Sequence, residues 1–153
     1  MLIPIMFFAG CLLSGSGTVA FHGTSMLPTI RDGQLLRTLK LDQESRGNLK
    51  RGDVVVFKAP DDLTKSYIKR IIALPGDRIE IRQGEVWLNE LKQSEPYLTA
   101  RLNVNARTYA EVSLQPNTYY IMGDNRDNSA DSRIFGPVSG DLIEAKVVLP
   151  DTK

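Results

Sequence analysis

The chain has 153 residues, about the size of one domain, and its apolar share of 42% is enough for a hydrophobic core. The 19 basic and 18 acidic side chains leave a net charge of +1, which offers no broad field to attract nucleic acid, so no nucleic-acid partner is expected. With one cysteine and one histidine, an intrachain disulfide is excluded and metal sites rich in either residue are disfavoured. We expect no metal or other cofactor.

The chain begins with an apolar segment, and no charged side chain occurs before residue 31. A membrane helix needs roughly 20 apolar residues, and this segment is most apolar only over residues 1–13, so its length is marginal. We interpret residues 1–21 as an apolar anchor or a signal-like segment. Three alternatives remain open: a short membrane anchor, a lipoprotein signal in which FAGC leaves a lipidated Cys11, and a segment that packs on the folded domain.

Beyond residue 30 the pattern is typical of strands, with β-branched runs, period-two alternation and turn residues between them. Residues 39–50 allow a turn or a short helix. The predicted strands cover residues 53–59, 66–74, 78–90 as a hairpin, 118–124 and 142–150.

We therefore predict a mostly β fold: an antiparallel β-sheet core with a smaller inserted β subdomain, preceded by the short apolar segment. The subdomain is expected to include the stretch 91–117, which is more polar and lacks a clear pattern. The expected boundaries are 22–150 for the folded domain, 22–78 and 118–150 for its core, and 79–117 for the inserted subdomain.

Ser25 stands in GTSMLPTIRDG (23–33), just after the apolar segment, and is either a turn residue or a nucleophile held near a membrane. A serine hydroxyl is a weak nucleophile at neutral pH and needs a base. His22 is close in the chain, but its simpler interpretation is an exposed side chain at the polar edge of the apolar segment. A dyad of Ser25 with His22 is therefore the weaker hypothesis.

Lys69 is the better candidate for the base. Strand alternation places it with Tyr67, Ile71 and Ala73 on one otherwise apolar face. Burial on that face would disfavour the ammonium ion and lower the lysine pKa by several units. The strand pattern alone favours a lysine whose stem lies on the sheet while its head reaches water. The pattern thus yields a Ser-Lys candidate and no more.

A charge-rich loop, GDNRDNSADSRIFG, covers residues 123–136. Asp127, Ser129 and Asp131 have the spacing with which a calcium loop begins. However, Ser132 replaces the required glycine and Val138 stands where the twelfth position needs glutamate, so we disfavour calcium.

Opposite charges in and around this loop suggest that it is held against the lysine strand. We expect ion pairs of Asp124 with Arg70 and of Asp131 with Arg133. Ser129 would then form a hydrogen bond with the lysine amine and orient its lone pair.

Four blocks in this order resemble type I signal peptidases, membrane-anchored serine proteases that remove signal peptides from exported proteins. The blocks are GTSMLPTIRDG (23–33), RGDVVVFKAP (51–60), YIKRIIALPGDRIEI (67–81) and GDNRDNSADSRIFGPV (123–138), and the resemblance spans residues 20–148. It implies that Ser25 is the nucleophile, Lys69 the general base and Ser129 the residue that positions Lys69. The residues it implies to hold the site together are Asp124, Arg70, Asp131 and Arg133.

The resemblance also implies partners and a location: preproteins that bear signal peptides, the lipid bilayer, and a catalytic domain on the outer face of the cytoplasmic membrane. In some members a hydroxyl side chain two residues before the nucleophile contributes to the oxyanion hole, and here that position is Gly23. We expect the backbone N–H of Ser25 to serve, with Thr24 adjacent and the second donor left open.

Three alternative functions are compatible with part of this pattern. Self-cleaving repressors share the chemistry, but the chain shows neither a helix-turn-helix domain nor an internal cleavage segment. A specialised peptidase for a conjugation or pilus precursor would keep the same residues. A catalytically silent, membrane-tethered β-domain that binds partners is disfavoured, because Ser25, Lys69 and Ser129 are all intact.

Overall fold

The computed structural model describes residues 16–150 and contains two antiparallel β-sheets. The larger has the strands β1 (Ser16–Ala20), β2 (Leu35–Lys40), β3 (Val54–Ala59), β4 (Asp62–Ala73), β9 (Thr118–Met122), β10 (Val138–Ser139) and β11 (Ile143–Val147). The smaller has β5 (Arg78–Arg82), β6 (Glu85–Leu88), β7 (Leu91–Lys92) and β8 (Tyr109–Ser113). The helices are short: α1 (Gln43–Gly47), α2 (Ser132–Phe135) and 3₁₀ turns at Ala100–Leu102 and Gly140–Leu142.

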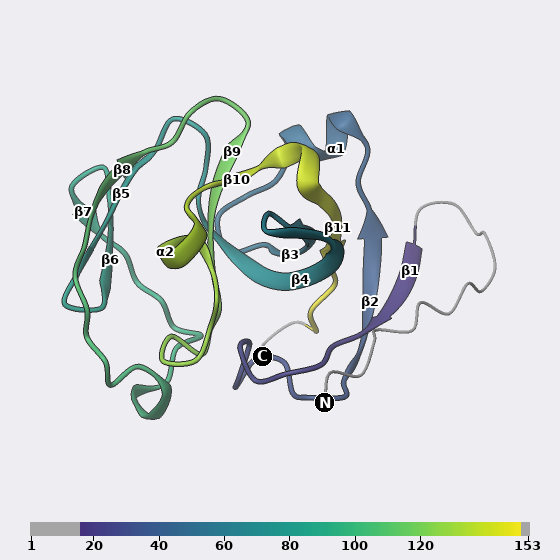
Figure 1. The fold of residues 1–153 in the computed structure, drawn as a ribbon, viewed down its shortest axis with the longest axis horizontal. Helices are drawn as coiled ribbons and strands as arrows, with labels where there is room; N and C mark the ends of the chain where they lie inside the picture. The colour runs from purple at the N-terminus through teal and green to yellow at the C-terminus, as the bar shows by residue number, and fades with distance from the viewer. Residues whose placement is uncertain (1–15, 151–153) are drawn as a thin grey trace.

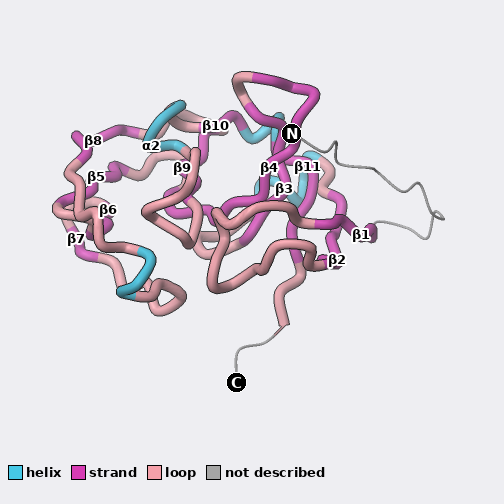
Figure 2. Tube along the Cα trace, turned by 60° about the horizontal axis from the view of Figure 1, so that its bottom comes forward, coloured by secondary structure: helices cyan, strands magenta, loops and turns pink. Residues whose placement is uncertain are grey.

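The larger sheet has the strand order β1-β2-β11-β3-β4-β9-β10, and the smaller has the order β7-β6-β5-β8. The smaller sheet lies between β4 and β9 in the chain. It forms one end of the molecule, whereas β1 and β2 form the other (Figure 1; Figure 2). The prediction of a mostly antiparallel β fold is therefore confirmed.

The centre of the larger sheet is buried on both faces, as the continuous apolar run of β3 requires. Val55 and Phe57 pack into one hydrophobic cluster, and Val54 and Val56 pack into another. The second cluster also contains three side chains of the segment that follows β1: Phe21, Met26 and Ile30. Burial of these three residues holds the segment that carries Ser25 against β3 and β4.

A third cluster joins the two sheets. The ends of β4 and β9 contribute Ile72, Ala73 and Met122, which pack against Ile79 and Ile81 of β5. The β4–β9 pairing shifts register between Ile71 and Ala73. Because of this irregularity, Ala73 packs with Ile72 rather than on the face of Ile71, so the predicted single face of Tyr67, Lys69, Ile71 and Ala73 is wrong at its last residue.

The predicted strands are present as β3, β4, the β5–β6 hairpin, β9 and β11, and α1 lies within the stretch 39–50. α1 begins with a capping box in which Asp42 and Ser45 bond to each other's backbone N–H. Strands β1, β2, β7, β8 and β10 were not predicted.

The apolar segment 1–21 falls mostly outside the described residues, and so does Cys11. Its last part forms β1, which pairs with β2, so the sheet begins before residue 22. Within residues 16–150, no helix has the length and apolar character needed to cross a membrane.

Candidate active site

Ser25 lies on a turn held from both sides by the core. Phe21 before it and Met26 and Ile30 after it are buried, and Ile30 N–H donates to the Met26 carbonyl at 2.9 Å. The backbone N–H of Phe21 donates to the Gln34 carbonyl, also at 2.9 Å, which ties the turn to the start of β2. The Ser25 hydroxyl, at the tip of this anchored turn, is partly exposed.

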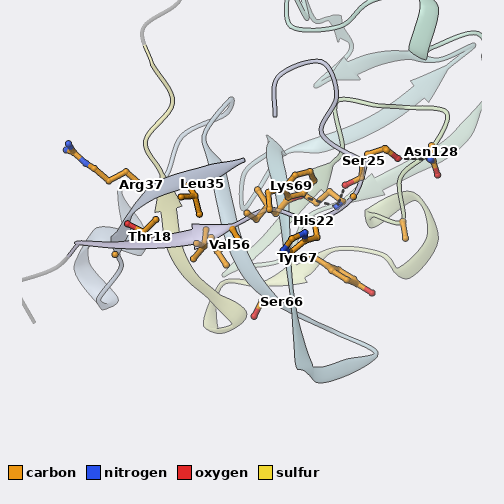
Figure 3. Close-up of a pocket in the computed structure, with 18 of the residues that line it drawn as sticks. Thr18, His22, Ser25, Leu35, Arg37, Val56, Ser66, Tyr67, Lys69 and Asn128 are labelled. Atoms are coloured by element: carbon orange, nitrogen blue, oxygen red, sulfur yellow. Dashed lines mark hydrogen bonds between the residues drawn. The ribbon is translucent and has the colours of Figure 1, made fainter. Parts of the chain in front are cut away.

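Lys69 points from β4 to this hydroxyl (Figure 3). Its Nζ lies 2.8 Å from Ser25 Oγ and donates to the Ile68 carbonyl at 3.0 Å. Lys69 is 4% exposed. No carboxylate of residues 16–150 forms an ion pair with it.

Burial lowers the pKa of Lys69 from 10.5 to about 8, although the charges of Asp131 and Asp124 act to raise it. An amine with a pKa of about 8 is neutral in roughly a tenth of the molecules at pH 7 and in about half of them at pH 8. A neutral amine can accept the proton of a serine hydroxyl, which an ammonium ion cannot do. The pair is therefore arranged for nucleophilic catalysis.

Arg70, the next residue of β4, has the opposite environment. Its guanidinium donates to both Asp124 oxygens, at 2.9 and 2.6 Å, and to the Gly52 carbonyl at 2.8 Å. Thr29 also donates its hydroxyl to Asp124. Burial lowers the Arg70 pKa, but the hydrogen bonds and charge of Asp124 raise it more, so the net direction is upward. This ion pair fixes the start of the charge-rich loop to β4.

The second expected ion pair is also present. Arg133 donates to both oxygens of Asp131 at 2.8 Å, and Asp131 accepts the Gly123 N–H at 3.0 Å. Burial raises the pKa of Asp131, but the Arg133 hydrogen bonds and charge lower it below its usual value. Asp131 stays ionised and holds the Gly123 peptide.

Gly123 lies where a side chain has no room. A Cβ at this position would overlap Ser129 Oγ and the Ser25 carbonyl oxygen. Ser129 Oγ is thus next to the nucleophile's backbone. Ser129 Oγ is buried, and no group of residues 16–150 lies within hydrogen-bond distance and angle of it. The expected hydrogen bond to Lys69 is therefore absent from this structure.

Two asparagines of the loop, which sequence reasoning did not single out, bind the Ser25 turn. Asn125 N–H donates to the Ser25 carbonyl at 3.0 Å, and Asn125 Nδ2 donates to the Thr24 carbonyl at 3.0 Å. Asn128 Nδ2 donates to Thr24 Oγ1 at 2.8 Å. Both asparagines lie inside the loop GDNRDNSADSRIFG. Their amide groups, which can donate hydrogen bonds to a neighbouring turn, were the feature from which this role could have been predicted.

A groove of about 750 Å³ leads to the dyad. Its walls come from β1, from the Ser25 turn, and from Val56 and Ile68 of β3 and β4. Leu35 and Arg37 of β2 also line it and were not predicted, because β2 itself was not. Arg37 and Thr18 lie away from Ser25 along the groove (Figure 3).

The residues of the two rival sites have other partners in this structure. His22 is largely exposed, with its side chain 60% accessible, and its Nδ1 faces Asp32 at 3.8 Å, whereas Ser25 Oγ is bonded to Lys69. Asp127 accepts backbone N–H groups of Val104 and Asn105. Residues 16–150 contain no cluster of three or more potential metal ligands.

The family model described as signal peptidase, peptidase S26, matches residues 1–150. The chain belongs to this signal peptidase family. It is 34% identical to signal peptidase IB of Staphylococcus aureus over 158 residues, covering 94% of this chain and 80% of that protein. It is 38% identical to signal peptidase I of Bacillus licheniformis over 119 residues, covering 73% and 63%. The resemblance stated from the four blocks is confirmed.

The fold agrees with that of a signal peptidase as well. A crystal structure of a signal peptidase I from Enterococcus faecalis V583 superimposes with a TM-score of 0.56 at 27% identity, covering 65% of this chain and 96% of that one. The fold of this signal peptidase family member is therefore similar to that of a solved signal peptidase I.

Proposed function

We propose that Ser25 and Lys69 form the dyad with which this member of the signal peptidase family removes signal peptides from exported preproteins. The observation that carries the proposal is the 2.8 Å contact between Lys69 Nζ and Ser25 Oγ, made by a lysine that is 4% exposed. Burial without an ion-pair partner supplies a base, and the contact aims this base at the nucleophile.

The reaction then has two halves. Neutral Lys69 takes the Ser25 proton as Oγ attacks the scissile carbonyl, and return of that proton to the leaving amine gives an acyl-enzyme. Lys69 next takes a proton from water, which attacks the ester and releases the carboxylate product. The Ser25 hydroxyl is restored when Lys69 returns the proton.

The oxyanion of each tetrahedral intermediate needs donors. Within residues 16–150 the Ser25 N–H has no acceptor, so it is free to bind a substrate oxygen. The Gly23 N–H is not free, because it donates to Asp32 at 2.8 Å. Thr24 Oγ1 accepts from Asn128, which leaves its own proton to donate. We assign the Ser25 N–H and the Thr24 hydroxyl as the two donors.

The substrate would lie extended in the groove beside β1, which is an edge strand of the larger sheet. An edge strand offers unpaired backbone groups to a peptide. The resemblance to signal peptidases implies small residues at the first and third positions before the cut, and Phe21, Val56 and Ile68, which line the groove, would bound the pockets for them.

The location follows from the chain order. Ser25 comes shortly after the apolar segment 1–21, so an anchor or signal-like segment there would hold the groove at a membrane surface. We place the catalytic domain on the outer face of the cytoplasmic membrane, where signal peptides of exported chains emerge.

The test is cleavage of a purified preprotein with an Ala-x-Ala site, in detergent, from pH 6 to 10. The parent is expected to cut after the second alanine, with a rate that rises through an apparent pKa near 8. Ser25→Ala and Lys69→Ala should each abolish the cut. Ser113→Ala and Lys92→Ala, both exposed on the smaller sheet, are matched controls and should retain it. Cleavage by Ser25→Ala at the parent rate would refute the dyad.

A further inference from the structure

The connection between β7 and β8 reaches from the smaller sheet to the back of the charge-rich loop. This stretch is the polar segment without a clear pattern in the sequence, yet it buries an acidic side chain. Glu95 accepts from both terminal nitrogens of Arg126, with Nη1 at 3.1 Å from Oε2. The two side chains are only 8% and 6% exposed. Neither residue lines the groove.

Arg126 in turn holds the glycine that lies against the dyad. Its Nε donates to the Gly123 carbonyl at 3.0 Å, and the Gly123 N–H donates to Asp131 at 3.0 Å. Gly123 is therefore fixed on both sides, by a cation at its carbonyl and by an anion at its N–H. Each of these ions has one buried partner: Glu95 for Arg126 and Arg133 for Asp131.

Tyr97 connects the same segment to β4. Its hydroxyl donates to Glu95 Oε1 at 2.8 Å, and the centroid of its ring lies 4.0 Å from the guanidinium carbon of Arg70. Arg70 follows Lys69 directly in β4. A displacement of Glu95 would therefore reach the dyad by two routes, through Gly123 to the Ser25 backbone and through Tyr97 to the lysine strand.

We infer that Glu95 is a positioning residue for the dyad, acting through Arg126 and assisted by Tyr97. The inference rests on the proposed function of Ser25 and Lys69. Ser25 Oγ must stay within hydrogen-bond reach of Lys69 Nζ, and a misplacement of about 1 Å at a reacting centre can cost about 10²-fold in rate. The connection between β7 and β8 thus contributes to catalysis without touching the substrate.

The experiment is steady-state cleavage of the Ala-x-Ala preprotein by full-length Glu95→Gln. Glu85→Gln is the matched control, because Glu85 is an exposed partner of Lys92 on the smaller sheet. Both are measured at a temperature where circular dichroism shows them fully folded. We expect kcat of Glu95→Gln to fall by roughly tenfold or more with KM within about twofold, and Glu85→Gln to match the parent.

Tyr97→Phe keeps the ring on Arg70 and removes only the hydrogen bond to Glu95. It should lower kcat by about two- to fivefold and decides the question if Glu95→Gln does not fold. A kcat of Glu95→Gln within about twofold of the parent, or a change confined to KM, overturns the inference. So does a loss of kcat that merely follows the unfolded fraction. Retained cleavage by Ser25→Ala would instead overturn the proposed function, so the two failures are distinguishable.

Discussion

Lys69 and Arg70 are neighbouring residues on opposite sides of β4, and their pKa values shift in opposite directions. Lys69 and Arg70 are both buried, at 4% and 7% exposure. On one side the lysine bonds to a hydroxyl and a carbonyl oxygen, with the centroid of the Tyr67 ring 5.4 Å from its Nζ and no carboxylate in contact, and burial lowers its pKa to about 8. On the other side the arginine meets a carboxylate and an aromatic ring, and its pKa moves upward.

The comparison shows that burial alone does not make a base. Desolvation disfavours the charged form in both residues, and the partner within hydrogen-bond distance decides the outcome. Because side chains alternate along a strand, the two consecutive residues Lys69 and Arg70 face two different environments. A reactive amine can therefore lie next to a permanently charged structural group, provided that the carboxylate of Asp124 pairs with Arg70 and not with Lys69.

Lys69→Arg breaks the comparison most severely, because it puts a group that stays protonated on the reactive side. The guanidinium cannot accept the Ser25 proton, so kcat/KM should fall by about 10²- to 10⁴-fold. Cleavage of the Ala-x-Ala preprotein at pH 9 measures the effect, with Lys92→Arg as the control for the substitution. Retention of a tenth of the parent activity would contradict the role of Lys69 as the base.

Asp124→Asn removes the charge on the other side. Arg70 then stays buried with no anion in contact, and breaking a buried pair in this way typically costs about 3–5 kcal/mol. Urea unfolding should show this loss in the free energy of unfolding, with the slope unchanged. A loss below about 1 kcal/mol would mean that the amide and Thr29 rearrange to satisfy the guanidinium.

Lys69→Met tests whether the lysine pKa is lowered, because a lowered pKa makes the stability difference between this variant and the parent depend on pH. The unfolded lysine titrates near 10.5 and the folded one near 8, so the unfolded state binds more protons between these values. Lys69 therefore opposes folding below pH 8 by about 3 kcal/mol, and this penalty disappears as pH rises toward 10.5. Unfolding at pH 7 and at pH 10 should show Lys69→Met more stable than the parent at the lower pH, with the gap narrowing at the higher. A constant gap would show that the lysine pKa is not lowered.

How far the sequence predicts this arrangement depends on whether the signal is local. The runs in β3 and β4 are local, so both strands and the candidate pair Ser25 and Lys69 were predicted. Strands β1 and β2 were not predicted, because β2 exposes Leu35 and Leu39 while it buries Thr38, so its apolar residues do not mark one face, and β1 consists mostly of small residues. The groove walls from these strands were missed with them.

Features that depend on contacts between residues far apart in the chain were also missed by prediction from the sequence. Glu95 stands in a stretch without periodicity, and its partner Arg126 is 31 positions away, so no spacing rule connects them. The register shift at the end of β4 likewise depends on pairing with β9, and it moved Ala73 to the other cluster. The opposite charges of Asp124 and Arg70 could be matched, because few buried cations were available in the strand.

The smallest effect is expected where an ion pair lies in solvent. Glu85 and Lys92 on the smaller sheet are 2.6 Å apart, the same distance as Arg70 and Asp124, but their side chains are 50% and 54% exposed. Water screens such a pair, and its loss is worth about 0–1 kcal/mol. Glu85→Gln should therefore shift the free energy of unfolding by less than about 1 kcal/mol in the urea experiment that measures Asp124→Asn. If the two substitutions cost the same, distance rather than desolvation would control these ion pairs. The contrast between the two sides of β4 would then need another cause.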